Sequence, residues 1–507
     1  MNPLAGKHIS YWIDSTAKDL FVSAIDDVSV DVAIVGAGIP GITAATLLKQ
    51  AGKTVALIDA DGVGMGASGH TTAKITALHQ IIYFALVDEI GEEKARLYGE
   101  SNLAAIEQIA KLVEQEQLDC DFERRSAYTF AESEENLEPI EKEVEACNKL
   151  GLPATFVRET SLPFQVAGAI RFDDQAQFHP RKYILQLAKN LPGNGSHVFE
   201  NTRVLDVESG SPCQVRTERG TIRATDVILA SNIPMLDRGL FFAKSYPKRS
   251  YLVAGKIDPE KAPDGMFIGT GDSYRSIRTT PSADGMLLLV GGEGHKTGSV
   301  DDTEERYAKL EQYLRDRFEV EPEYRWSSQD MMSMDKRPYI GKLTPLDERI
   351  YVATGFSLWG MTNGTLAAMI LRDLITGVEN PWADLYEATR ATPFLTEDSI
   401  QENMDVTKHW IGDRFKGADE EALMKLAPGE GQLVNVDGEK LAAYRDETGV
   451  VRTVSAVCSH LGCIVNWNPA EKSWDCPCHG ARFNCDGKVL RGPAVTPLEA
   501  KNAASDD

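Results

Sequence analysis

Four cysteines and two histidines lie close together near the C-terminal end of the sequence, at Cys458, His460, Cys463, Cys476, Cys478 and His479. They form two boxes, and each box combines thiols with one imidazole. A disulfide staple and a four-ligand zinc site are the simplest explanations, although zinc sites usually contain Cys-x2-Cys or His-x3-5-His pairs. One cysteine and one histidine per box instead favour a binuclear cluster, in which two thiolates bind one iron and two imidazoles bind the other.

The sequences of the two boxes match a known pattern. They are CSHLGC from residue 458 and CPCHG from residue 476, and they resemble the C-x-H-x-G-C and C-P-C-H-G boxes of the Rieske 2Fe-2S family. The resemblance implies four iron ligands and one disulfide: Cys458 and Cys476 on the inner iron, His460 and His479 on the outer iron, and a bridge between Cys463 and Cys478.

Two positions after the second box depart from the high-potential branch of this family. That branch has a serine and, two residues later, a tyrosine whose hydroxyls donate to the cluster sulfurs, whereas this chain has Ala481 and Phe483. Such donors favour the more negative, reduced cluster. Because each missing bond is worth roughly 1 kcal/mol, we expect each loss to lower the reduction potential by about 40 mV. The predicted potential lies in the lower half of the Rieske range of about −150 to +300 mV.

A second chemical signal lies near the start of the chain, in a strand–glycine–helix pattern. A buried-strand run at 30–35 leads into Gly36-x-Gly38-x-x-Gly41 and a helix pattern, and a second apolar strand ends at Asp59. Gly36 suits the tight turn, Gly38 lets the backbone approach a diphosphate, and Gly41 lets the helix pack on the strand. The helix N-terminus then faces the phosphates, and Asp59 would accept bonds from ribose hydroxyls. The pattern predicts a dinucleotide site, although an acid at a strand end can be a simple turn residue.

Further glycine-rich segments indicate which dinucleotide is bound. The segment GVGMGASGHTTAKIT begins at residue 62, and a late strand at 349–353 precedes a glycine-rich helix start. Together with the fingerprint, these segments resemble the FAD-dependent amino acid and amine oxidoreductases of the D-amino acid oxidase and glycine oxidase superfamily, over residues 28–380. A strand valine and a core methionine would also explain Val204 and Met361 without a ligand. The resemblance implies bound FAD with contacts from Gly66, Ser68, Thr71, Thr72, Val204, Gly355, Gly360, Met361 and Thr362.

The same resemblance implies that an arginine or tyrosine on a strand of a substrate domain binds the substrate carboxylate. The candidates are Arg278, Tyr251, Arg337 and His295, none of which lies in a diagnostic motif. A lone arginine is more often part of a structural ion pair. His70, inside the flavin loop, is a candidate for covalent attachment to the ring or for a place near the substrate.

The elements that position these residues suggest three parts. We expect an α/β FAD-binding domain of the Rossmann-like, glutathione-reductase type, an α+β substrate domain and a small all-β Rieske domain. Helices are predicted over 82–117, strands at 249–257 and 285–294, and short antiparallel strands after residue 430. The expected boundaries are 1–390 for the oxidoreductase (nucleotide-binding parts 28–80, 195–235 and 330–380; substrate parts 81–194 and 236–329), 391–424 for a linker and 425–507 for the Rieske domain.

Composition limits the partners. The formal charge of −23 argues against nucleic acid and against an anionic membrane surface. We find no apolar run long enough to span a membrane and no signal-peptide pattern, so we expect a cytoplasmic protein without a transmembrane segment. Three further cysteines, Cys120, Cys147 and Cys213, lie outside any motif and are expected to be reduced thiols in packing positions.

The union of the two cofactors suggests a direction of electron flow. A flavin oxidase that reacts with oxygen needs no metal, whereas a tethered cluster that carries one electron implies an acceptor outside the protein. We therefore predict a dehydrogenase that oxidises a small amine or amino acid with FAD and passes electrons singly through the cluster to an external acceptor, either a protein or a quinone. Because the amine must be uncharged for hydride loss, a pocket that lowers its pKa would suffice without a dedicated base.

Three alternatives compete with this hypothesis. An NADH-dependent reductase would need a second dinucleotide fingerprint, and the segment 290–298 lacks the third glycine. A Rieske oxygenase would need a mononuclear iron site, and the remaining histidines show no close pair. The third alternative is a redox sensor or electron carrier without a small-molecule substrate.

Overall fold

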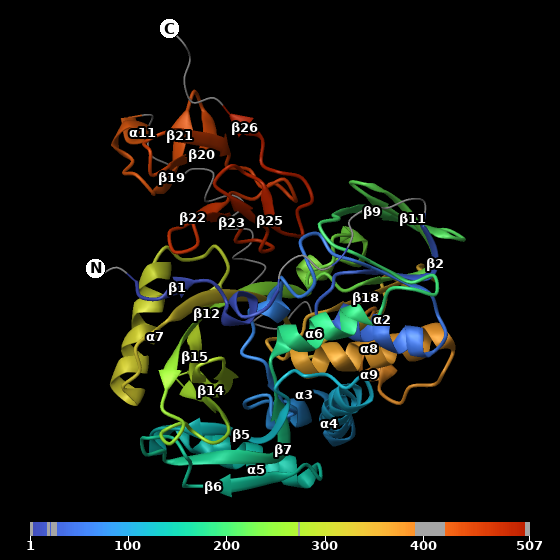
Figure 1. Cartoon of the computed structure of the whole chain (residues 1–507), viewed down its shortest axis with the longest axis vertical. Helices are drawn as coiled ribbons and strands as arrows, with labels where there is room; N and C mark the ends of the chain where they lie inside the picture. Colours follow the sequence, from blue (N-terminus) through green and yellow to red (C-terminus); the bar gives the residue numbers. More distant parts are fainter. Residues whose placement is uncertain (1–3, 18–20, 22–27, 272–273, 391–420, 502–507) are drawn as a thin grey trace.

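The computed structural model of the chain describes residues 4–17, 21, 28–271, 274–390 and 421–501. In Figure 1 a body with two large sheets occupies the lower part of the view, and a small β domain formed by the C-terminal residues lies above it. Among the described residues, no helix combines the length and the apolar character that a membrane span requires.

The first large sheet carries the glycine fingerprint. Its order is β17-β18-β11-β2-β3-β8, and β9 and β10 form a hairpin extension beside β11. Strands β18, β11, β2, β3 and β8 are all parallel, whereas β17 and β10 run antiparallel to their neighbours β18 and β11. The strands are β2 (Val28–Val35), β3 (Val55–Ile58), β8 (His197–Phe199), β9 (Val204–Glu208), β10 (Cys213–Thr217), β11 (Gly220–Leu229), β17 (Tyr339–Lys342) and β18 (Ile350–Thr354).

Helices cover one face of this sheet, and the β9–β10 hairpin together with Phe241 and Leu343 packs on the other face. The central strands are largely apolar, as in β3, because both faces of the sheet are buried. Helix α2 follows β2 directly and packs against α8, which comes from the C-terminal part of the oxidoreductase sequence. The helices nearest the sheet are α2 (Ile39–Gln50), α6 (Pro180–Lys189), α8 (Gly360–Thr376) and the short α9 (Ala383–Tyr386).

The second large sheet is mixed and mostly antiparallel, in the order β1-β16-β12-β15-β14-β13-β5-β7-β4, with β6 paired to β7. The predicted strands at 249–257 and 285–294 are confirmed as parts of β12 and β15. Its strands are β1 (Lys7–His8), β4 (Lys74–Ile75), β5 (Glu123–Ala131), β6 (Ala154–Val157), β7 (Gly168–Gln177), β12 (Ser245–Ile257), β13 (Met266–Gly269), β14 (Arg275–Ser282), β15 (Gly285–Lys296) and β16 (Tyr324–Ser333).

The remaining helices and 3-10 turns of the body lie around the two large sheets. The predicted helical segment at 82–117 is confirmed, with a break at Gly91, whose φ of 82° suits glycine. Helix α7 packs on β12 and β15, as Figure 1 shows. The elements are α1 (Tyr11–Asp14), α3 (Tyr83–Ile90), α4 (Glu92–Gln115), α5 (Glu138–Lys149), α7 (Thr303–Phe318), and the 3-10 turns η1 (Ala67–Gly69), η2 (Glu134–Asn136), η3 (Asp237–Gly239) and η4 (Phe241–Ala243).

The C-terminal domain is all-β, as predicted, and contains two small antiparallel sheets, β19-β20-β21-β26 and β22-β23-β24-β25. The cluster boxes lie on loops beside the second sheet. Most of the predicted linker, 391–420, lies outside the described residues. The elements here are α11 (Glu421–Lys425), β19 (Gly431–Val436), β20 (Glu439–Arg445), β21 (Val451–Ser455), β22 (Asn466–Asn468), β23 (Ser473–Asp475), β24 (Arg482–Asn484), β25 (Val489–Arg491) and β26 (Ala500–Lys501).

Candidate functional site

A long cavity runs along the carboxyl ends of the parallel strands and continues over the second sheet. Gly36 and Gly38 line it where β2 turns into α2. A Cβ on Gly41 would lie 1.8 Å from the Gly36 carbonyl oxygen, so only glycine allows α2 to start so close to the strand. The φ of 108° at Gly36 likewise requires glycine for the turn. These contacts agree with the packing roles that the fingerprint predicts.

Asp59 lies at the end of β3 and lines the same cavity. Its carboxylate accepts hydrogen bonds from the backbone N–H groups of Ala37, at 2.8 Å, and Asp61, at 3.0 Å. Burial raises the pKa of Asp59 to about 6, although these bonds oppose the shift. The carboxylate is therefore fixed beside the fingerprint, where the expected ribose contact would be made.

The second glycine-rich loop lies against the start of α2. Gly66, Ser68, Thr71 and Thr72 all line the cavity. The Ser68 hydroxyl accepts a hydrogen bond from the Ile39 backbone N–H at 3.0 Å, which attaches the loop to the helix N-terminus. The loop and the helix start form one continuous wall.

The remaining expected flavin contacts divide into two groups. Val204, Gly360 and Met361 line the cavity, the last two at the first turn of α8. Gly41, Gly355 and Thr362 lie behind it. The Thr362 hydroxyl is 3.1 Å from Nε2 of the buried His79 and therefore faces the protein interior.

Asp330 on β16 is a cavity residue that sequence reasoning missed. Its carboxylate accepts hydrogen bonds from the backbone N–H of Leu358, at 2.7 Å, and from the amide of Asn232, at 3.1 Å. Burial raises the pKa of Asp330, and these bonds oppose the shift without cancelling it. Because Leu358 has a φ of 74°, the carboxylate holds the unusual turn that precedes α8. A single acid within a strand gives no sequence signal for this role.

Two of the four candidate substrate residues, Tyr251 on β12 and His295 on β15, contact each other: the Tyr251 hydroxyl lies 2.9 Å from Nε2 of His295. Tyr251 lines the cavity, but its side chain is buried and its ring packs against Tyr307 of α7, and His295 is not among the lining residues. Burial lowers the pKa of His295 to about 4 and raises that of Tyr251. The pair is therefore neutral at pH 7, and its hydroxyl–imidazole contact lies outside the cavity lining.

The other two candidates do not line the cavity. The Arg278 guanidinium is buried and donates to the backbone carbonyls of Thr72, Ala73 and Phe178, at 3.1, 2.9 and 3.3 Å. It thus supports the flavin loop from behind. Arg337 pairs with Asp335 at 3.0 Å. Both arginines are engaged in structural contacts.

His70 lies where the flavin cavity meets a second, smaller cavity, and it lines both. Its Nδ1 is 2.8 Å from the Gly66 carbonyl oxygen, and burial lowers its pKa to about 4. The imidazole is therefore neutral at pH 7. Covalent attachment to the ring and a place near the substrate both remain predictions for His70.

The four expected iron ligands form two pairs on the cluster loops of the C-terminal domain, one of thiols and one of imidazoles. A hydrogen bond between the Cys458 and Cys476 thiols lowers the pKa of Cys458, which is otherwise raised by burial. The rings of His460 and His479 have centroids 5.0 Å apart. Among the described residues, His460 Nδ1 is buried and has no hydrogen-bond partner. Two thiols and two imidazoles, one of which has a buried ring nitrogen without a partner, fit a 2Fe-2S cluster with mixed ligands.

The flanking cysteines form the disulfide that the family resemblance implies, Cys463 to Cys478. The sulfur atoms of this pair lie within 4.8 Å of Cys476. Ala481 and Phe483 are buried in the same core and have no hydroxyl to offer. The scattered cysteines, Cys120, Cys147 and Cys213, are free and buried, in agreement with the packing role predicted for them.

The histidine end of the cluster site faces the body. His460 Nε2 lies 2.9 Å from a carboxylate oxygen of Asp237 in η3, and the His479 ring has an edge contact with Phe242 in η4, at 5.2 Å between centroids. Beside them, the Gln329 side-chain amide of β16 donates to the Gly480 carbonyl at 2.8 Å.

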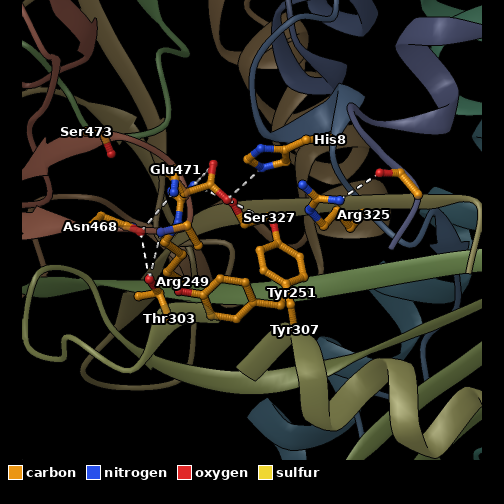
Figure 2. Close-up of polar contacts among 12 residues, drawn as sticks. His8, Arg249, Tyr251, Thr303, Tyr307, Arg325, Ser327, Asn468, Glu471 and Ser473 are labelled. Carbon is orange, nitrogen blue, oxygen red and sulfur yellow. Dashed lines mark hydrogen bonds and ion pairs between the residues drawn. The ribbon is translucent and has the colours of Figure 1, made fainter. Parts of the chain in front are cut away.

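A buried polar cluster holds the C-terminal domain on the second sheet (Figure 2). The Arg249 guanidinium of β12 pairs with Glu471 at 3.0 Å, and the Tyr307 hydroxyl donates to the same carboxylate at 2.9 Å. Thr303 at the start of α7 donates to the Asn468 side chain at 2.9 Å. Despite burial, Arg249 keeps the pKa of Glu471 well below its usual value. The ion pair is thus charged and fixes the orientation of the domain.

Comparison with known proteins agrees with this two-part organisation. Residues 31–374 match the family model "FAD dependent oxidoreductase", and residues 420–501 match "Rieske [2Fe-2S] domain". YhfW of Bacillus subtilis, which carries the name of a Rieske 2Fe-2S iron-sulfur protein, is 37% identical, with 97% of each chain covered. Gamma-glutamylputrescine oxidoreductase of Escherichia coli is 26% identical over 73% of this chain and 89% of its own. The glycine oxidase structure from Geobacillus kaustophilus has a TM-score of 0.62 at 21% identity, over 72% of this chain and 99% of that chain.

Proposed function

Because the chain belongs to the FAD-dependent oxidoreductase family and also contains a Rieske [2Fe-2S] domain, we propose that it is an amine or amino acid dehydrogenase. FAD supplies hydride acceptance from a C–H bond next to nitrogen, and the cluster supplies one-electron transfer to an external protein or quinone. Gly36, Gly38, Asp59, Ser68 and the first turn of α8 would hold FAD. Cys458, Cys476, His460 and His479 would hold the cluster.

The cavity wall near His70 suits an amine that reacts in its neutral form. His70 lines the cavity, and because burial lowers its pKa to about 4, it adds no positive charge there at pH 7. A buried wall of this kind disfavours an ammonium ion and therefore lowers the pKa of a bound amine. The carboxylates of Asp59 and Asp330 accept hydrogen bonds from backbone N–H groups. We therefore assign neither of them the role of a base, and a neutral amine does not require one. The amine in the name of the relative gamma-glutamylputrescine oxidoreductase supports this substrate class.

The observation that carries the proposed electron transfer is the docking of the cluster site on the flavin cavity. Ser328 and Asp330 line that cavity, and Gln329 between them bonds to Gly480, next to the ligand His479. The path between the two sites therefore crosses one residue and one hydrogen bond. Such a short connection supports transfer within one chain, which a separate oxidase would not need.

The test is to remove one cluster ligand and follow the flavin. In Cys476→Ser, we expect the cluster's electron paramagnetic resonance (EPR) signal to be lost, while anaerobic addition of a substrate amine still bleaches the flavin band. Turnover with a one-electron acceptor should fall to background. Cys485→Ser is the matched control, because Cys485 is a free thiol of the same domain outside the ligand set. If bleaching disappears together with the cluster, the proposed order of transfer is wrong.

A panel of amines and amino acids tests the substrate class. Bleaching by at least one amine, with recovery on addition of a one-electron acceptor, is the result expected for a dehydrogenase. If no amine or amino acid of the panel bleaches the flavin band, the proposal is contradicted and a redox sensor or electron carrier is favoured. NADH serves as a further control, because a reductase would bleach with NADH instead.

A further inference from the structure

The Rieske domain forms part of the wall of the flavin cavity. The segment 490–495, which includes the end of β25 and the residues after it, lines the same cavity as Gly36, Gly38 and Asp59. The backbone carbonyl of Val489 is also 3.5 Å from the Arg203 guanidinium of the body. A domain separated from the fingerprint by most of the sequence thus closes one side of the dinucleotide site.

One side chain of this segment, Arg491, has an unbalanced charge. Its Nη1 donates to the Gln329 backbone carbonyl at 3.3 Å, and among the described residues no carboxylate lies within ion-pair distance. Its neighbours differ: Arg249 pairs with Glu471 at 3.0 Å, and Arg482 pairs with Asp475 at 2.8 Å.

Burial and repulsion from Arg482 and Arg249 lower the pKa of Arg491 to about 10, although the carboxylates of Asp61 and Asp330 oppose the shift. The guanidinium remains charged at pH 7, because that value lies well above neutrality. Asp61 and Asp330 act on this partly buried cation only from beyond ion-pair distance, so its environment still favours an anionic ligand in direct contact.

The location of Arg491 indicates where that ligand lies. A Cβ on Gly66 would be 3.5 Å from Nη2 of Arg491. Gly66 belongs to the loop whose Ser68 hydroxyl is bonded to the Ile39 N–H at the start of α2. The guanidinium and the helix N-terminus therefore flank the same loop, and both attract negative charge. On the other side Arg491 lines the second cavity together with His70.

We propose that Arg491 of the Rieske domain binds an oxyanion inside the flavin cavity, so that the FAD site is complete only when this domain is docked. The position beside Gly66 favours the diphosphate of FAD as the source of the oxyanion. A substrate carboxylate offers the same chemistry, and that source alone rests on the proposed function. Either ligand would supply the direct ion-pair partner that the surrounding side chains do not provide.

The first arm of the test measures FAD binding to the full-length chain after removal of the flavin. For Arg491→Gln we expect the dissociation constant of FAD to rise about tenfold or more, as the loss of a charge-assisted contact predicts. ADP should lose affinity similarly, whereas adenosine, which lacks the diphosphate, should not. Arg452→Gln is the matched control, because Arg452 is exposed and pairs with Asp446 and Asp486 away from the cavity.

The second arm uses benzoate as a carboxylate probe and benzamide as its neutral counterpart, each followed by the flavin absorbance of the holoenzyme. If Arg491→Gln weakens benzoate binding alone and leaves FAD and ADP unchanged, the oxyanion is a ligand carboxylate. If FAD, ADP and benzoate all bind the variant as they bind the wild type, the proposal is overturned. The Rieske EPR signal reports whether the domain is intact. Arg491→Lys keeps the positive charge but cannot donate two parallel hydrogen bonds as a guanidinium does, so it should lose less affinity. This variant is used for the test if Arg491→Gln does not fold.

Discussion

The hydrogen bond between Asp237 and His460 predicts that the body tunes the cluster potential. In Asp237→Asn the side-chain oxygen can still accept from His460 Nε2, 2.9 Å away, but the negative charge is removed. A charge-assisted bond exceeds a neutral one by roughly 1 kcal/mol, and we take this low value because the Asp237 side chain is 45% exposed. Since a tenfold change is about 1.4 kcal/mol or 59 mV for one electron, the effect is about 40 mV.

The sign of this shift follows from charge. A carboxylate stabilises the oxidised, more positive cluster, so its removal should raise the reduction potential. An EPR-monitored redox titration at fixed pH measures the change. Asp486→Asn is the control, because it removes the same charge from a surface carboxylate that pairs with Arg452. The reasoning is refuted if the two variants shift the potential equally, or if Asp237→Asn lowers it.

The remaining predictions concern the cluster, the docking contact and acid stability. Ala481→Ser and Phe483→Tyr should each raise the cluster potential by about 40 mV in the same titration, because each restores a donor toward the sulfurs; no shift would mean that the hydroxyl does not reach them. Arg249→Met should cost up to about 3 kcal/mol in the free energy of unfolding, measured with denaturant, because it removes the nearer arginine and leaves the Glu471 carboxylate with the Arg482 guanidinium at 3.8 Å; an additional Glu471→Leu should recover part of the loss. Burial lowers the pKa of His79 from its usual 6.5 to about 3, so folding stability should be full above pH 6.5 and fall between pH 6.5 and 3 as only the unfolded chain binds the proton. At pH 5 this costs about 2 kcal/mol, and His79→Gln should flatten the pH dependence of the melting temperature; an unchanged slope would contradict it.

The parts that could be predicted from the sequence are those in which chemistry depends on local spacing. Four ligands in two short loops specify the cluster, because the loops bring them together without the rest of the chain. The same is true of Gly36 and Gly41, whose role follows from one turn between a strand and a helix. The cofactors and the fold class could therefore be predicted before the tertiary arrangement was known.

Residues whose role depends on distant partners could not be found in this way. Arg278 has the residue type and strand position expected for binding a carboxylate, yet three backbone carbonyls already engage its guanidinium. Arg491 lies in a domain for which sequence reasoning expects only a cluster, and it lines the flavin cavity because of how that domain docks. Asp237 and His460 are 223 residues apart in the sequence. In each case the partner, and therefore the chemistry, is decided by packing between domains.

The contacts of Gln329 and Arg491 couple flavin binding, docking of the Rieske domain and the electron path between the two sites. Gln329 bonds to the cluster loop through Gly480 and also accepts a hydrogen bond from Arg491. If Arg491 binds an oxyanion of FAD, the docked arrangement has a higher affinity for FAD than an undocked one. By linkage, FAD at about 100 times its dissociation constant would then stabilise a domain arrangement that alone can bind it by about 2.7 kcal/mol. Occupancy of the flavin site would therefore favour the docked Rieske domain and the short path through Gln329, so that a bound flavin stabilises its own electron route to the cluster.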